Sequence, residues 1–257
     1  MNKTALCVFI VLILPVWVVA QNTSYYEAIQ KDAANQVPPK QFQQMEEDAL
    51  KDFSRPETYE QLAKSFGNST EKVWGVIYGE VFCNLTPDPD SRNAMGALVY
   101  QWYEKSFSGG DTNLTVDLSE NAEAREGQFP FENQFEFTFL FGASRFFRTV
   151  PPLSLRKLAA IREIQVSAWT KRQLLPNELV IWQQSIIDAG YFEAYNYLLF
   201  QSARRDEFNQ WIKEHQADYQ AWTDWLAKNK FTVRKPDFQR LYIMRSAPEP
   251  TITGPVS

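Results

Sequence analysis

The sequence predicts an all-α protein, built as an array of short antiparallel helices, with one small extended or β element near residues 112–119. Three observations predict this fold class. Apolar residues recur at spacings of three and four in most segments, as they do on one face of a helix. Prolines and glycines interrupt these segments at short intervals. Aromatic residues make up 15% of the chain, which is enough to fill a large core between short helices.

The first twenty residues have the pattern of a secretory signal peptide. Lys3 gives a basic start, Ala5–Ala20 is an apolar run of 16 residues, and compact residues precede Gln21. The run is shorter than the roughly 18–20 residues that span a bilayer. We therefore expect cleavage before Gln21 and export to the periplasm or the extracellular space of a bacterial cell envelope, with no stable membrane insertion. An uncleaved membrane anchor is the alternative.

Charge and cysteine content limit the partners and the chemistry. Residues 21–150 carry 11 Lys and Arg against 20 Asp and Glu, whereas residues 151–257 carry 14 against 11. This asymmetry favours docking between the two halves of the chain or self-association between molecules. The clustered basic face that nucleic acid requires is missing. Signal cleavage leaves only Cys83, which we expect to be a buried thiol, with a disulfide-linked dimer as the alternative.

Residues 21–108 form the predicted N-terminal helical region. After a polar lead-in, its helices are expected at residues 41–53, 56–67, 70–84 and 91–107. Pro56 is suited to a first helical turn and Gly67 to a helix end. Asn68 and Glu71 have the spacing of a capping pair for the third helix. That helix carries two adjacent apolar stripes, which predict burial over more than half of its circumference.

Residues 109–127 are predicted to be an irregular linker. Leu114, Val116 and Leu118 alternate with polar residues within it, which permits a short strand. The stretch 129–147 fits two structures, because its phenylalanines have a period of two, as in a strand, and Phe131, Phe135 and Phe139 are also four apart, as in a helix. We favour the helix, since the neighbouring long segments are helical and no partner strands are visible.

Residues 128–229 form the predicted C-terminal helical region. It opens with the 129–147 stretch and an amphipathic helix at 154–173, and closes with four short helices within 177–229. Asn177 and Asp206 are suited to helix starts, and Gly190 is suited to the left-handed position after a helix. An aromatic-x-x-aromatic spacing recurs at Phe192/Tyr195, Phe208/Trp211 and Tyr219/Trp222, so each short helix directs two rings toward its neighbours. Residues 230–257 are expected to be a basic segment followed by a disordered tail.

The closing helices resemble tetratricopeptide-type helical repeat proteins. Gly190-Tyr191-Phe192-Glu193-Ala194 is similar to the Gly-x-aromatic-Glu-x-Ala turn that joins the two helices of such a repeat. Ala194 falls one place early, however, and Phe192 to Tyr219 spans 27 residues instead of about 34. The resemblance covers residues 177–229 and implies binding of peptides or proteins on a concave surface.

Few residues can carry chemistry. His215 is the single histidine and lies near Asp218, but a metal site needs three or four ligands, so no metal or cofactor is expected. No catalytic residue is assigned, since Cys83 lies in an apolar helix where its thiol should be inert. Phosphate-binding and dinucleotide-binding glycine loops do not occur in the sequence.

Glu80 is the carboxylate with two interpretations. It is the only charge between Val73 and Leu85. A place at the margin of the apolar stripe, paired with an arginine, is the first interpretation. The second is burial opposite Glu132 or Glu136, where a raised pKa would suit acid–base work on a glycan.

The function expected from these observations is binding or scaffolding of another protein or peptide in the cell envelope. Tyr197 and Trp225 are candidate binding residues, because their rings fall outside the three-residue aromatic pattern that directs rings inward, and Asn196 is a third candidate beside them. The alternative is an envelope glycan hydrolase or lyase that uses Glu80, with Trp182 or Trp222 as sugar platforms.

Overall fold

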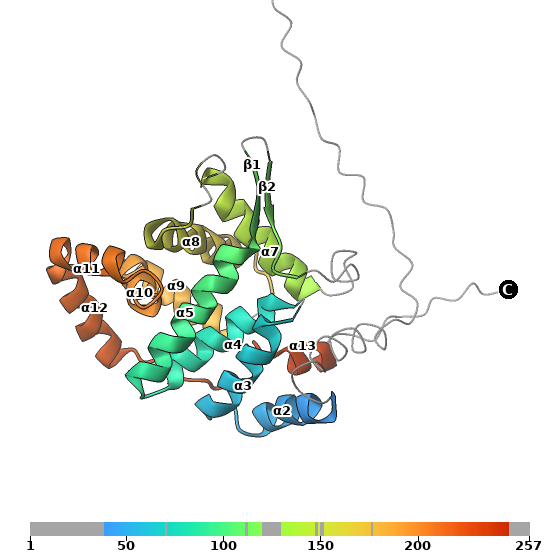
Figure 1. Cartoon of the computed structure of the whole chain (residues 1–257). Coiled ribbons are helices and arrows are strands. Elements are labelled where there is room, and N and C mark those ends of the chain that lie inside the picture. The colour runs from blue at the N-terminus through green and yellow to red at the C-terminus, as the bar shows by residue number, and fades with distance from the viewer. Residues whose placement is uncertain are drawn as a thin grey trace, which may run out of the picture.

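The computed structural model describes residues 39–246, except residues 70, 111–112, 120–129, 147–148, 150–151 and 176. The predicted signal peptide and the tail after residue 246 lie outside the described residues. Eleven α-helices and one two-stranded sheet form the regular structure of the described part, which confirms the all-α fold class (Figure 1). Within these ranges no helix combines the length and apolar character needed to cross a membrane.

The first half contains α2 (Pro39–Lys51), α3 (Pro56–Gly67), α4 (Lys72–Leu85), α5 (Pro89–Ser106), β1 (Phe107–Gly110) and β2 (Asn113–Val116). The second half contains α7 (Pro130–Ala143), a 3-10 turn at Ser144–Phe146, α8 (Leu155–Lys171), α9 (Glu178–Asp188), α10 (Phe192–Leu199), α11 (Arg205–Glu214), α12 (Gln216–Lys228) and α13 (Arg240–Ser246).

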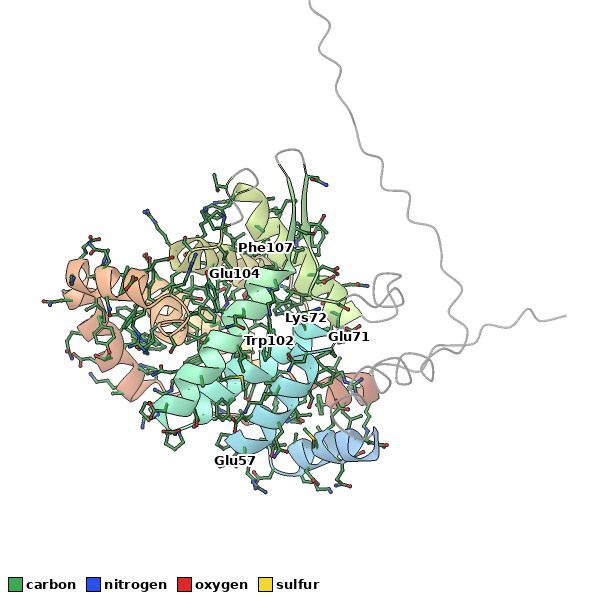
Figure 2. The ribbon with its side chains drawn as sticks, in the orientation of Figure 1. Glu57, Glu71, Lys72, Trp102, Glu104 and Phe107 are labelled. Atoms are coloured by element: carbon green, nitrogen blue, oxygen red, sulfur yellow. The ribbon has the colours of Figure 1, made fainter. Side chains whose placement is uncertain are left out.

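Helix α4 is the centre of the fold. Every residue from Val73 to Cys83 is buried, which exceeds the burial of more than half the circumference that its two apolar stripes predict. Helices α3 and α5 pack against it (Figure 1). The approach of α3 is close enough that a Cβ on Gly75 would lie 2.5 Å from the backbone of Gly67. Trp102 of α5, labelled in Figure 2, packs as closely, since a Cβ on Gly67 would lie 2.0 Å from its ring.

The predicted capping pair at the start of α4 is wrong, although the helix itself is confirmed. Asn68 closes α3 instead, and its Nδ2 donates to the carbonyl oxygen of Lys64 at 2.9 Å. Glu71 occupies the cap position without making a capping bond, because its carboxylate accepts a hydrogen bond from Ser119 Oγ at 2.6 Å. Figure 2 shows Glu71 at this end of α4. A partner distant in sequence has replaced the local one.

Strands β1 and β2 form an antiparallel hairpin, which confirms the extended element expected near residues 112–119. Phe107 pairs with Val116 and Gly110 with Asn113, so the glycine-rich segment after α5 is itself a strand. Helix α7 lies beside the hairpin and confirms a helix within 129–147 (Figure 1). Its buried face includes Phe131 and Phe139, whereas Phe137 is 52% exposed.

The second half stacks short helices around α8, which packs against α7 and α10. Asn177 caps α9, with its Oδ1 accepting from the backbone nitrogens of Leu179 and Val180, and Gly190 has φ +80°, both as predicted. The predicted cap at Asp206 is wrong, because α11 begins at Arg205 with Arg204 at the cap position, and Asp206 lies inside its first turn. Both rings of the pairs Phe192/Tyr195 and Phe208/Trp211 are buried, and so is Trp222 of the third pair.

Ion pairs join the acidic first half to the basic second half. Arg240 of α13 is fully buried against Glu46 of α2, and Arg245 pairs with Glu47 beside it. The backbone nitrogen of Arg240 also donates to Tyr78 Oη on α4 at 2.9 Å. Ion pairs between basic residues of the second half and acidic residues of the first half therefore join α13, at the end of the described chain, to α2 at its beginning.

Candidate functional site

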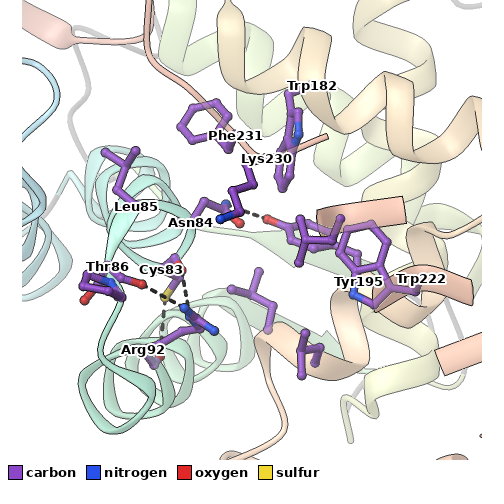
Figure 3. A pocket seen from close by; sticks show the side chains of 14 residues that line it. Cys83, Asn84, Leu85, Thr86, Arg92, Trp182, Tyr195, Trp222, Lys230 and Phe231 are labelled. Atoms are coloured by element: carbon purple, nitrogen blue, oxygen red, sulfur yellow. Dashed lines mark hydrogen bonds between the residues drawn. The ribbon is translucent and has the colours of Figure 1, made fainter. Parts of the chain in front are cut away.

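A pocket of about 310 Å³ lies where the C-terminal end of α4 faces α9, α10 and α12 (Figure 3). Its apolar lining combines the rings of Trp182, Tyr195, Trp222 and Phe231 with aliphatic side chains such as Leu198 and Leu226. Its polar lining comes from Asn84, Thr86, Arg92 and Lys230. Two of its lining residues, Pro87 and Lys230, are exposed.

The aromatic wall is held by ring contacts between separate helices. Trp182 of α9 meets Tyr195 of α10 edge-on, with ring centroids 5.3 Å apart, and also contacts Phe231 at 5.2 Å. Tyr195 meets Trp222 of α12 at 5.7 Å. The Nε1 of Trp222 is buried and has no hydrogen-bond acceptor among the described residues, which is uncommon for a buried donor. The wall is therefore preformed and carries one unsatisfied donor.

The opposite wall is the end of α4, and a cation caps it. Arg92 Nε donates to the carbonyl oxygen of Cys83 at 3.1 Å, and its Nη2 donates to that of Thr86 at 2.8 Å. Carbonyl groups at a helix end have no partner within the helix, and a positive charge there is favourable. Lys230 adds a second cation, and none of the described residues that line this pocket is a carboxylate. The site is apolar with a positive side.

Behind the aromatic wall lies a buried polar network centred on Glu80. Its carboxylate accepts from Arg162 Nη2 at 2.5 Å, from Gln183 Nε2 at 2.6 Å and from Tyr195 Oη at 2.6 Å. Arg162 also donates to the side-chain oxygen of Asn196. Burial and the charge of Glu80 raise the pKa of Tyr195 well above its usual value, so the phenol stays a donor.

This arrangement decides between the two interpretations of Glu80. The pairing with an arginine is present, but Glu80 is 2% exposed and lies at the centre of the fold rather than at the margin of the apolar stripe. Glu132 does not face it and instead accepts from Trp74 Nε1 at 2.8 Å. Glu136 accepts from the backbone nitrogen of Leu118 at 2.6 Å. A buried carboxylate held by three donor side chains is poorly placed to exchange protons with a glycan.

The three candidate binding residues do not form one surface. Asn196 is fully buried and is a hydrogen-bond partner of Arg162. Its neighbour Tyr197 points in another direction, because adjacent residues of a helix are rotated by about 100° from one another. Tyr197 is buried and stacks on Trp211, with centroids 4.7 Å apart, at a shallow acidic groove. Burial raises the pKa of Tyr197 to about 12. Trp225 is half-buried and stacks on Trp222 at 5.5 Å, which supports the pocket wall from behind.

His215 and Cys83 occupy structural positions. His215 lies between α11 and α12 and stacks on Trp211, with centroids 5.0 Å apart. No group of three or more metal-binding side chains occurs within the described ranges. Cys83 is buried as expected, and burial raises the pKa of its thiol.

Sequence reasoning missed the polar side of the pocket. Asn84, Arg92 and Lys230 come from α4, α5 and the segment after α12, and no spacing in the sequence connects them. The available signal was the abundance of tryptophan in the second half, and Trp182 and Trp222 do line the pocket. No protein-family model, curated protein or solved structure matches this chain.

Proposed function

We propose that the protein is an exported helical binding module that takes an apolar part of a peptide or of another protein into the pocket between α4 and α9–α12. The observation that carries the proposal is the preformed aromatic wall facing a polar helix end across about 310 Å³. Ligand sites in proteins combine such a largely apolar lining with a few fixed polar groups.

The size of the pocket favours a segment of a longer chain as the occupant. Small-molecule sites usually span about 300–1,000 Å³, so this pocket lies at the lower limit. That volume suits one or two side chains, and the exposed lining residues Pro87 and Lys230 place part of the pocket at the surface, where the rest of the ligand can remain. Trp182 and Tyr195 present flat faces and edges, which contribute much contact area at small cost in conformational entropy.

Binding is also favoured over catalysis by the lining itself. The titratable lining side chains are Cys83, Arg92, Tyr195 and Lys230, and the pKa values of the thiol and the phenol are raised. Within the ranges that the structure describes, no acid–base pair of carboxylates lines the pocket, and Glu80 is paired with Arg162 behind the wall. Hydrolysis of a glycan would require two accessible carboxyl groups on either side of the bond.

Filling the pocket tests the proposal. Leu226→Trp adds volume to a half-buried lining position, and Ile181→Trp is the control, since Ile181 of α9 is 63% exposed and does not line the pocket. The probe is a synthetic tripeptide pool with apolar last residues, half with free and half with amidated C-termini, and binding is followed by tryptophan fluorescence. We expect saturable binding that Leu226→Trp weakens at least tenfold and Ile181→Trp leaves unchanged. Absence of saturable binding, or equal binding by both variants, rejects the proposal.

Export is supported by the basic start and the apolar run of residues 1–20, described from the sequence above. Expression of the full chain in a bacterium, with fractionation and mass determination, tests it. Mature protein that begins at Gln21 in the periplasm or medium is expected, and full-length protein in the cytoplasm contradicts export.

A further inference from the structure

We propose that the pocket recognises the C-terminal residue of a peptide chain, with its carboxylate held by Lys230 and Arg92 and its apolar side chain against the aromatic wall. This inference rests on the proposed binding function and specifies the ligand. The first argument is charge, because the lining contributed by the described part of the chain has two cations and no carboxylate. A cationic site with apolar walls selects an anion that has an apolar body.

The second argument is the fixed position of Arg92. Its guanidinium is anchored by two carbonyl oxygens at the end of α4, at 3.1 and 2.8 Å, so little conformational entropy remains to be lost when it binds an anion. Its Nη1 has no hydrogen bond to the part of the chain that the structure describes, which leaves donors for a ligand. The negative end of the α4 dipole opposes an anion here, but it amounts to about half a charge against two full cations.

The third argument concerns Asn84 and separates a peptide from a simple fatty or aromatic acid. Glu80 accepts the proton of Tyr195 Oη, so this phenol oxygen must accept from Asn84 Nδ2, at 2.9 Å. Asn84 Nδ2 also donates to the carbonyl oxygen of Glu80 at 2.8 Å. The amide orientation is thereby fixed, and Asn84 Oδ1 remains as an acceptor on a residue that lines the pocket.

These groups match the last residue of a peptide. Its carboxylate meets Lys230 and Arg92, and its backbone N–H donates to Asn84 Oδ1. Figure 3 shows Asn84 and Arg92 on one side of the pocket and Tyr195 and Trp222 on the other, with Lys230 near Asn84.

Three probes test the assignment by isothermal titration calorimetry: N-acetyl-Ala-Ala-Leu as the free acid, the same peptide as its C-terminal amide, and 4-methylpentanoate. The last probe keeps the carboxylate and the leucine side chain without a peptide N–H. We expect the free acid to bind at least tenfold more tightly than either of the others, and its affinity to fall with added salt.

Lys230→Met should reduce the preference for the free acid over the amide at least fivefold. Lys228→Met is the matched control, because Lys228 is exposed at the end of α12 and does not line the pocket. Equal binding of acid and amide overturns this inference but leaves the proposed binding function standing. Tight binding of 4-methylpentanoate overturns the peptide assignment in favour of free carboxylic acids. Absence of binding by all three probes and by the peptide pool overturns both proposals.

Discussion

Glu80 and Arg162 form a buried ion pair that joins α4 to α8, so neutralising Glu80 should destabilise the whole fold. Glu80→Gln preserves the size of the side chain but leaves the guanidinium of Arg162, which is 1% exposed, without its counter-charge. Arg162, Gln183 and Tyr195 all donate hydrogen bonds to the Glu80 carboxylate. The glutamine amide replaces one acceptor oxygen by an NH₂ donor, so it cannot accept all of these bonds.

The expected loss is large. Removing one partner of a buried ion pair costs roughly 3–5 kcal/mol, because the other charge remains buried and unpaired. A domain is stable by about 5–15 kcal/mol in total, so the variant should unfold at much lower urea concentration. The measurement is urea unfolding of the mature protein, followed by tryptophan fluorescence and circular dichroism.

The matched control is Glu60→Gln, which removes an exposed pair with Lys64 at 2.7 Å and should cost less than about 1 kcal/mol. If Glu80→Gln is too unstable to purify, Gln183→Leu removes only one donor to Glu80 and should cost about 1.5–3 kcal/mol. Equal stability of Glu80→Gln and Glu60→Gln would refute the reasoning. A catalytic carboxylate would show the opposite behaviour, with turnover lost and stability intact.

Two further predictions concern the start of α4 and its packing. Burial, together with the charges of Glu132 and Glu136, raises the pKa of Glu71 from 4.5 to about 8 despite a hydrogen bond from a serine. Between pH 4.5 and 8, Glu71 therefore keeps its proton in the folded state and loses it in the unfolded chain. The free energy of unfolding accordingly falls as the pH rises through this range, by up to about 1.4 kcal/mol per pH unit. Glu71→Gln should flatten this slope in urea titrations at pH 5.5 and 7.5, and an unchanged slope contradicts the assignment. Gly67→Ala places a Cβ 2.0 Å from the Trp102 ring and should lower stability by about 1–3 kcal/mol in thermal unfolding, whereas an unchanged midpoint would show that the helices can separate freely.

Local patterns in the sequence determined the helical fold class and much of the core. The two apolar stripes of α4 predicted burial over more than half of its circumference, because residues three and four apart share a helix face, and the structure extends this burial to every residue from Val73 to Cys83. Asn177 and Gly190 were correctly placed at the two ends of α9, since their capping partners lie within a few residues. The helix within 129–147 was favoured because the neighbouring long segments are helical, since the spacing of its phenylalanines fitted a strand equally well.

Tertiary structure decided the partners of the polar groups and the pocket. Glu80 and Arg162 are 82 residues apart, and Glu46 and Arg240 are 194 apart, so no periodicity could pair them. The predicted pairing of Asn68 with Glu71 was wrong for the same reason, because distant Ser119 holds Glu71 instead. Spacing in a sequence specifies which face a side chain occupies, whereas the side chain that it meets depends on how the helices are oriented in space.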